Sequence, residues 1–223
     1  MMRRIIGVLS LLPFIIVLMS GCNTIVEKQV KKSFELYMTE IQSGNISQDE
    51  IDDMMGDFLE GTELSEANQK DLADAFINML TKLSYTVTSC KKDANDKNTY
   101  VISVDLKTVD GSAILMNDAL MKELVGFVFI KALSGGFEDM EQIEEEVVDL
   151  WAQKVLEASK TAAATKDVST KFTIKYDPAS KSYDYAGSQE EIMSLVGLEG
   201  SGAASLQDEI RESIAKKMNP FSF

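Results

Sequence analysis

The chain has 223 residues, of which 45% are hydrophobic and 26% are charged, and its formal net charge is −14. This composition supplies enough apolar material for one folded core and is too apolar for a disordered chain. The chain contains no histidine and two cysteines, which excludes His-dependent catalytic triads, His-ligated metal sites and a disulfide framework. The sequence therefore indicates a compartment and a broad fold, but no specific activity.

The first 21 residues have the layout of a secretory signal peptide. A basic start at Arg3 and Arg4 precedes an apolar run over residues 5–19 that contains Pro13. The run is shorter than the roughly 20 residues that a membrane-spanning helix needs, and the proline would disturb such a helix. We therefore expect a cleaved signal peptide over residues 1–21, and a retained transmembrane anchor is the alternative.

The segment Leu18-Met19-Ser20-Gly21-Cys22 resembles the lipobox of bacterial lipoproteins, in which the cysteine is lipidated and becomes the first residue after cleavage. The resemblance predicts lipidation of Cys22 with palmitate-like acyl chains and a location on the extracytoplasmic face of the cell membrane. Two or three such chains anchor a protein stably, whereas one chain is marginal. The alternative is an ordinary signal peptide with a chance cysteine.

The remaining chain is strongly acidic. Removal of residues 1–21 leaves 20 basic and 36 acidic residues, a net charge of −16. Such a charge repels nucleic-acid phosphates and anionic headgroups, so nucleic acid is excluded as a partner and only the lipid is expected to contact the bilayer. A protein or cell-wall partner of basic character is favoured. We expect a lipid-anchored domain over residues 22–202 and a C-terminal helix or tail over residues 203–223.

The first half of the mature chain is predicted to be helical. Apolar residues at three- and four-residue spacing predict an amphipathic helix over residues 23–42, which begins almost at the lipid site. A capping box that starts at Ser47 predicts a short second helix to about Leu59, and a third helix is expected from about Ser65.

A strand period follows. Alternating residues predict an antiparallel hairpin from strands at about 83–88 and 100–106, and Cys90 is expected to pack in this sheet as a small residue. Asp93, Asn95 and Asp96 in the turn suggest a calcium loop, because hard cations bind closely spaced oxygens. The glycine and the terminal glutamate of such a loop are missing, so a plain turn is the favoured interpretation.

The middle of the chain predicts two long helices, over about 113–133 and 138–165. The first contains a nearly continuous apolar run from Leu124 to Ile130. Charged residues interrupt it too often for a membrane span, so a buried helix is expected. Together the two helices predict a helical hairpin.

The apolar excess of this hairpin suggests a candidate hydrophobic pocket lined by Leu124, Phe127, Val128 and Trp151. The alternative is that these residues form ordinary core, which is the more common role of such stripes.

The last part of the chain predicts a second hairpin and two helices. Strands are expected at 168–176 and 183–185, a short helix over 188–196, and an amphipathic segment over 206–218.

The element order and the final hairpin Lys-Phe-x-Ile-Lys-Tyr-Asp-x-x-x-Lys-x-Tyr, which begins at Lys171, resemble a known family. The pattern is similar to that of uncharacterised lipoproteins of monoderm bacteria with a nuclear transport factor 2-like, or cystatin-like, domain. The resemblance covers about residues 25–187. It implies an α+β fold in which a curved antiparallel sheet of about four strands wraps the N-terminal helices and ends at Tyr183 or Tyr185, with the helical hairpin inserted between strands. That superfamily includes enzymes, binding modules and structural proteins, so the fold alone assigns no function.

No catalytic residue, metal ligand or cofactor is predicted. Acidic clusters at residues 49–53 and 141–146 lie in first turns of predicted helices, where the helix dipole favours acids, so solvated faces are expected. The favoured function is a cell-surface lipoprotein that acts as a non-enzymatic binding or interaction module. The alternatives are an enzyme with an Asp or Glu base in the domain cavity, and a hydrophobic-ligand binding protein. A transporter solute-binding protein is disfavoured, because strands and helices are grouped rather than alternating.

Overall fold

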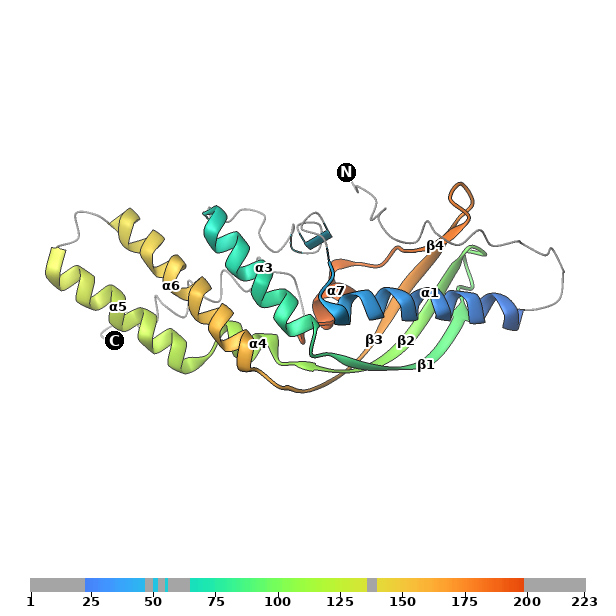
Figure 1. The fold of residues 1–223 in the computed structure, drawn as a ribbon, viewed down its shortest axis with the longest axis horizontal. Helices are drawn as coiled ribbons and strands as arrows, with labels where there is room; N and C mark the ends of the chain where they lie inside the picture. Colours follow the sequence, from blue (N-terminus) through green and yellow to red (C-terminus); the bar gives the residue numbers. More distant parts are fainter. Residues whose placement is uncertain (1–22, 47–49, 52–54, 56–64, 136–139, 199–223) are drawn as a thin grey trace.

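The protein has an α+β fold, as the sequence predicts. The structure, a computed structural model, describes residues 23–46, 50–51, 55, 65–135 and 140–198. This described part is elongated, with a sheet and one long helix in one half and a group of helices in the other (Figure 1). The predicted signal peptide, Cys22, most of the predicted second helix and the predicted C-terminal segment lie outside the described residues.

The sheet has four antiparallel strands that follow chain order, β1-β2-β3-β4. They are β1 (Ser84–Lys92), β2 (Thr99–Val109), β3 (Ala164–Asp177) and β4 (Ser182–Tyr185). Both predicted hairpins are confirmed, and the helical insertion lies between β2 and β3. The sheet curves around the first helix (Figure 1).

The first helix, α1 (Asn23–Ser43), fills the concave side of the sheet. Its buried side chains recur every three or four residues and are at most 1% exposed: Val30, Phe34, Met38 and Ile41. The ring of Phe34 lies 5.2 Å from that of Phe172 in β3. This regular stripe is the amphipathic pattern that the sequence predicts, and it joins α1 to the sheet as one core.

The other half of the molecule is a helical layer of α3 (Glu66–Leu80), α4 (Gly111–Leu115), α5 (Asp118–Gly135) and α6 (Met140–Thr161). Helix α3 packs extensively on α6, and α6 packs on α5. The predicted start of α3 is confirmed, because Ser65 is its N-cap.

Polar side chains also join α3 to α6. Asn68 Nδ2 donates to Asp149 Oδ1 at 2.5 Å, and Asn78 Nδ2 donates to Ser159 Oγ at 3.2 Å. These bonds lie two turns apart or more along α3, so they fix its register against α6.

The prediction of one continuous helix over 113–133 is wrong. The chain breaks after α4, and Asn117 Oδ1 accepts hydrogen bonds from the backbone nitrogens of Ala119 at 2.8 Å and Leu120 at 3.4 Å. An asparagine that satisfies free N–H groups in this way starts a new helix. Helix α5 therefore begins at Asp118.

The expectation that this apolar helix is buried is correct only for one side of it. Phe129, Ile130 and Leu133 are 64%, 67% and 72% exposed, respectively, among the described residues. The physical reason is that α6 is the main element against which α5 packs.

The boundary between α6 and β3 also differs from the prediction. Helix α6 ends at Thr161 rather than near residue 165, and β3 starts at Ala164 rather than at residue 168. Ala164 pairs with Val109 at the end of β2, past an irregularity in the register. Pairing with a long neighbouring strand thus overrides the helix propensity of the local alanines.

A short last helix, α7 (Gln189–Ser194), is held against the end of the sheet. It stops before the predicted residue 196, yet Leu195 and Val196 are fully buried. The hydroxyl of Thr108 in β2 donates to the Leu195 carbonyl, and Gly111 N–H donates to the Val196 carbonyl at 2.9 Å. These contacts fix the position of α7 beside β3.

Candidate binding groove

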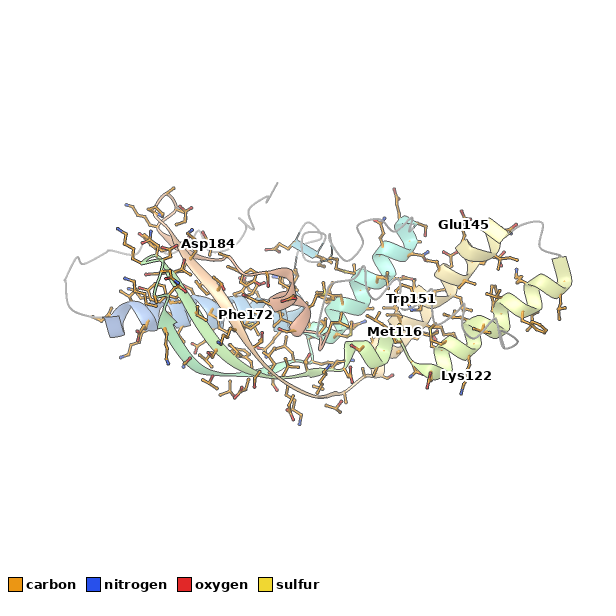
Figure 2. All side chains as sticks on the ribbon, turned by 180° about the vertical axis from the view of Figure 1, so that it is seen from behind. Met116, Lys122, Glu145, Trp151, Phe172 and Asp184 are labelled. Atoms are coloured by element: carbon orange, nitrogen blue, oxygen red, sulfur yellow. The ribbon has the colours of Figure 1, made fainter. Side chains whose placement is uncertain are left out.

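The four residues predicted to line a hydrophobic pocket lie in the packed helical half. Leu124, Val128 and Trp151 are at most 8% exposed, and Phe127 is partly buried against the same core. Trp151 lies in the middle of α6 (Figure 2), and its Nε1–H donates to the Leu115 carbonyl at 3.2 Å. The two hollows described below are lined by other residues, so the pocket stays a prediction.

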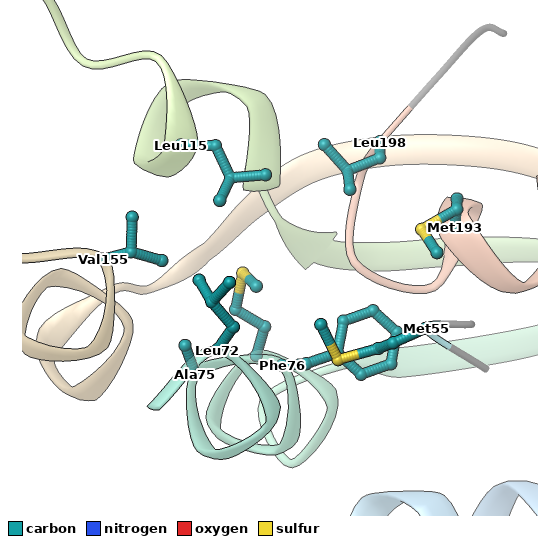
Figure 3. A pocket seen from close by; sticks show the side chains of 9 residues that line it. Met55, Leu72, Ala75, Phe76, Leu115, Val155, Met193 and Leu198 are labelled. Atoms are coloured by element: carbon teal, nitrogen blue, oxygen red, sulfur yellow. The ribbon is translucent and has the colours of Figure 1, made fainter. Parts of the chain in front are cut away.

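One of these hollows is a small apolar void between α3, α4 and α7 (Figure 3). Its volume is about 20 Å³, which is close to the space of a single water molecule. Its lining is apolar throughout: Met55, Leu72, Ala75, Phe76, Met79, Leu115, Val155, Met193 and Leu198. Such a void is a packing imperfection and offers no room for a ligand.

The other hollow is a polar groove of about 510 Å³ that lies against β1, β2, β3 and the start of α7. We call it the β3 groove. Ligand pockets typically have volumes of about 300–1,000 Å³, so this groove is large enough for a ligand. It is lined by Thr88, Ser103, Val104, Asp105, Ser169, Thr170, Lys171, Ser188, Glu190 and Glu191.

The backbone groups of β3 alternate between its two neighbours. The N–H of Tyr176 donates to the Asn98 carbonyl on the β2 side at 2.8 Å, whereas the Thr173 carbonyl accepts from Ala186 N–H on the opposite side at 2.8 Å. In an antiparallel strand, successive residues direct their backbone groups to opposite sides. Odd-numbered residues near this point of β3 therefore direct theirs away from β2.

On this side of β3, β4 pairs only with residues 174–177. Helix α7 contacts the rest of this side at Thr173, and Gly197, just after α7, accepts a hydrogen bond from Lys166 Nζ at 2.8 Å. Ser169 and Lys171 direct their backbone groups to the uncovered side, and within the described residues no strand pairs there. Both residues line the β3 groove. Within the described residues, the groove thus runs along a section of strand edge between Lys166 and Thr173 that no strand pairs with, and such an edge is a template for another extended chain.

The uncovered edge ends at Glu191 of α7. Its carboxylate accepts hydrogen bonds from the Thr173 backbone nitrogen at 3.0 Å and from Thr173 Oγ1 at 3.1 Å. It therefore occupies the place that the next carbonyl of β4 would take. Burial, followed by the nearby Glu191 charge, raises the pKa of Tyr185 well above its usual range.

The β3 groove has an acidic character. Asp105, Glu190 and Glu191 contribute carboxylates, and Lys171 contributes an ammonium group. Asp105 Oδ1 accepts a hydrogen bond from Ser169 Oγ at 2.7 Å, across the β2–β3 pair. The overall net charge of −14 adds to the negative potential of this surface.

Sequence reasoning missed the β3 groove. Ser103, Asp105, Ser169 and Lys171 occupy the solvent-facing positions of alternating strands, where polar residues are expected in any half-buried sheet. One signal was present in the sequence, because the predicted strand over 168–176 is much longer than its partner over 183–185 and must leave part of its edge unpaired.

The turn between β1 and β2 is closed by hydrogen bonds from its own backbone to Asp93. Asp93 Oδ1 accepts from the backbone nitrogens of Asn95 at 2.7 Å and Asp96 at 3.0 Å. Hydrogen bonds from the Asn98 backbone and the Thr99 hydroxyl lower the pKa of Asp96. Across the described ranges, no group of three Cys, Asp or Glu residues is placed to hold a metal ion.

The interior of the described part contains polar groups but no carboxylate. Its buried polar residues are Asn68, Thr108, Ser159 and Ser194. In the predicted acidic cluster over residues 141–146, Glu146 lies 2.5 Å from Lys131 Nζ, and this bond lowers its pKa. Glu145 is exposed, so the acids described here lie on the surface, as expected.

Within the described residues, no helix is both long enough and apolar enough to cross a membrane. In comparisons with known proteins, no family model, curated protein or solved structure matches the chain. The resemblance to lipoproteins with a nuclear transport factor 2-like domain therefore stays a prediction.

Proposed function

We propose that the protein is a lipid-anchored binding module on the extracytoplasmic face of the cell membrane, and that it binds an extended, basic polypeptide segment in the β3 groove. The observation that carries this proposal is the uncovered edge of β3 at Ser169 and Lys171, which lies within a groove of about 510 Å³. The proposed role is non-enzymatic.

Strand addition explains how such a site would gain affinity. An extended peptide beside β3 would pair with the backbone groups of Ser169 and Lys171, and main-chain hydrogen bonds of this kind supply affinity. Side-chain contacts beside the added strand supply specificity. Here these neighbours are Asp105, Glu190 and the hydroxyl of Ser188, which favour basic and polar side chains in the peptide.

The packing of α1 supports a site outside the sheet rather than inside it. The concave face that would form a catalytic or lipid-binding cavity is filled by Phe34, Met38 and Ile41, which are at most 1% exposed. The apolar void described above holds about 20 Å³. These observations disfavour the enzyme and the hydrophobic-ligand alternatives.

The lipid anchor rests on the sequence around Cys22. Helix α1 starts at Asn23, the next residue, so a lipid on Cys22 would hold that end of α1 at the bilayer. The start of α1 lies at one end of the long axis and the helical layer at the other (Figure 1). The sheet would therefore lie close to the membrane and the helical layer farthest from it.

The experiment that tests this function is affinity capture from solubilised membranes of the producing cells. Ser169→Pro removes one outward N–H and blocks strand addition, while leaving the bonds between β3 and β2, because proline is tolerated on strand edges. Ser169→Ala is the matched control, since both variants lose the Ser169 hydroxyl. We expect the wild-type chain and Ser169→Ala to capture the same protein and Ser169→Pro to lose it. Equal capture by all three would refute the proposal.

A further inference from the structure

Helix α5 exposes an apolar face at the end of the molecule. Phe129, Ile130 and Leu133 are more than 60% exposed among the described residues, and Gly126 lies on the same side one turn earlier. We call these four residues the distal face. The opposite side of α5 packs into the core through Leu124 and Val128, so this helix carries large apolar residues both on its buried side and on an exposed side. That pattern is typical of a helix covered on both sides.

Gly126 within the distal face indicates that another chain segment packs against this side of α5. Glycine in a helix interior costs up to about 1 kcal/mol relative to alanine. A Cβ atom at Gly126 would meet nothing within 4 Å among the described atoms, so no described contact requires glycine there. A residue without a side chain between large exposed apolar residues leaves a notch, which allows another backbone to approach closely.

The position of the distal face argues against a bilayer as its cover. A lipid on Cys22 would hold the start of α1 at the membrane, and α5 lies at the opposite end of the long axis (Figure 1). With the proposed lipid anchor, on which this conclusion rests, the cover of the distal face is a protein segment.

The chain itself provides a suitable segment. Residues 206–218 are predicted to form an amphipathic helix, in which Leu206, Ile210 and Ile214 follow one another at four-residue spacing. Such a helix has one apolar stripe that is buried only against another apolar surface. The distal face is a surface of this kind.

The described chain ends close enough for this segment to reach the distal face. Leu198 lines the same void as Leu115, three residues before α5 begins. Gly126 is eight residues into α5, about 12 Å along the helix at 1.5 Å per residue. Residues 199–205 can span up to about 23 Å when extended, at roughly 3.3 Å each. The segment therefore reaches the face.

We infer that residues 203–218 dock as a helix on the distal face of α5, with their closest approach at Gly126. This intramolecular contact covers Phe129, Ile130 and Leu133 and makes the C-terminal segment part of the domain rather than a tether. It adds a structural element that the proposed binding function does not require.

Cysteine labelling of the full chain in its membrane tests this inference. A cysteine is placed on the distal face by Ile130→Cys, and a reference cysteine on the exposed surface of β1 by Lys91→Cys, both in a Cys90→Ala background. We expect a maleimide to label Ile130→Cys at least about tenfold more slowly than Lys91→Cys, which corresponds to roughly 1.4 kcal/mol of opening free energy. Equal labelling rates would overturn the inference.

A pair of substitutions in the C-terminal segment tests whether that segment is what covers the distal face. Ile210→Asp places a charge on the apolar stripe of the C-terminal segment, whereas Ala215→Asp places the same charge on its opposite side. We expect Ile210→Asp to bring the labelling rate of Ile130→Cys to that of the reference, and Ala215→Asp to leave it slow. Slow labelling with Ile210→Asp would mean that a second copy or another protein covers the face, and would overturn the inference.

Gly126→Ala provides an independent readout. On an open helix face this substitution raises the melting temperature through helix propensity, by about 2–4 °C for a chain of this size. With a helix docked at the notch, the added methyl group separates the two helices and lowers it. We expect a decrease in the wild-type chain and an increase in the Ile210→Asp chain. An increase in both chains would contradict the docking.

Discussion

The carboxylate of Glu191 holds Thr173 by two hydrogen bonds, at 3.0 Å from its backbone nitrogen and at 3.1 Å from its hydroxyl. The contact joins α7 to β3 at the residue just before the section that β4 covers. The Glu191 carboxylate accepts the hydrogen bond that a backbone carbonyl of a longer β4 would accept. On the side of β3 away from β2, the section that pairs with no described strand begins at the next residue, Phe172. The limits of the proposed groove therefore depend on this pair.

Glu191→Ala is expected to destabilise the fold. The Thr173 N–H loses its charged acceptor, and hydrogen bonds to charged groups contribute about 1.5–3 kcal/mol. Glu190→Ala is the matched control, because Glu190 is exposed and adjacent, and its loss should change stability by less than about 0.5 kcal/mol. Urea denaturation followed by circular dichroism measures both. Equal effects of the two substitutions would show that the Glu191–Thr173 bonds do not hold the edge.

Trp151→Phe is expected to weaken the helical half. The change removes the hydrogen bond from Trp151 Nε1–H to the Leu115 carbonyl and leaves that acceptor unpaired, at a cost of about 1–3 kcal/mol. Gln153→Ala on the exposed side of α6 serves as the control. Thermal unfolding measured by calorimetry compares the two, and a stability for Trp151→Phe equal to that of the control would argue against this bond.

Cys90 is expected to react slowly at neutral pH. Burial is the main cause that raises the pKa of its thiol, to about 11, with a further contribution from the Glu27 charge. The thiolate is the reactive form, so alkylation of the folded chain should be slow at pH 8 and accelerate as the pH approaches 11. In denaturant the same thiol should react at the rate of an ordinary cysteine. Equal rates at pH 8 in the folded and denatured chain would contradict the assignment.

The same shift predicts a pH dependence of stability. Because the folded thiol holds its proton more tightly than the unfolded one, its contribution is fully present below about pH 9 and is lost as the pH rises to about 11. Cys90→Ala should lose this dependence, and denaturation midpoints at pH 8 and 10.5 compare the two chains. An identical pH response of both chains would show that another group is responsible.

Gly197→Ala is expected to cost more stability than Gly44→Ala. Both glycines have positive φ angles, +69° and +68°, so alanine at either position adds roughly 1 kcal/mol of backbone strain. A Cβ at Gly197 would also collide with the backbone carbonyl of Val109, whereas at Gly44 its neighbours are methyl groups of Thr81 and Ile77. Side chains can move away from an added methyl group more easily than the backbone can. Chemical denaturation of both variants measures the difference in their free energies of unfolding. Equal losses would show that the loop after α7 adapts.

Much of the fold follows from local patterns in the sequence. The stripe of α1, the Ser65 cap of α3 and the two hairpins are visible in one sequence, because spacing and capping act over a few residues. The predicted element boundaries are wrong where another interaction is stronger than the local helix pattern. Asn117 interrupts the predicted helix because its side chain caps a new one. Ala164 is predicted to be helical but lies in β3, where it pairs with Val109.

The candidate site was less predictable than the fold. Ser169 and Lys171 are ordinary exposed strand residues in the sequence, and they gain significance from what their neighbours do not cover. That depends on the four-residue length of β4 and on the placement of α7, which are set by contacts between residues far apart in the chain. By contrast, the pocket suggested by Leu124 and Trp151 came from hydrophobicity, which core packing explains equally well.

The most direct test of the account is photo-crosslinking from the groove in membranes of the producing cells. A photoreactive amino acid replaces Lys171 in the β3 groove, and the same amino acid at exposed Glu145 on α6 is the reference. We expect a specific protein to be crosslinked from position 171 and not from position 145, through an extended basic segment. We also expect loss of the product at high salt, because exposed charges are screened. The same products from both positions, or none from position 171, would contradict the proposal that this groove binds a polypeptide.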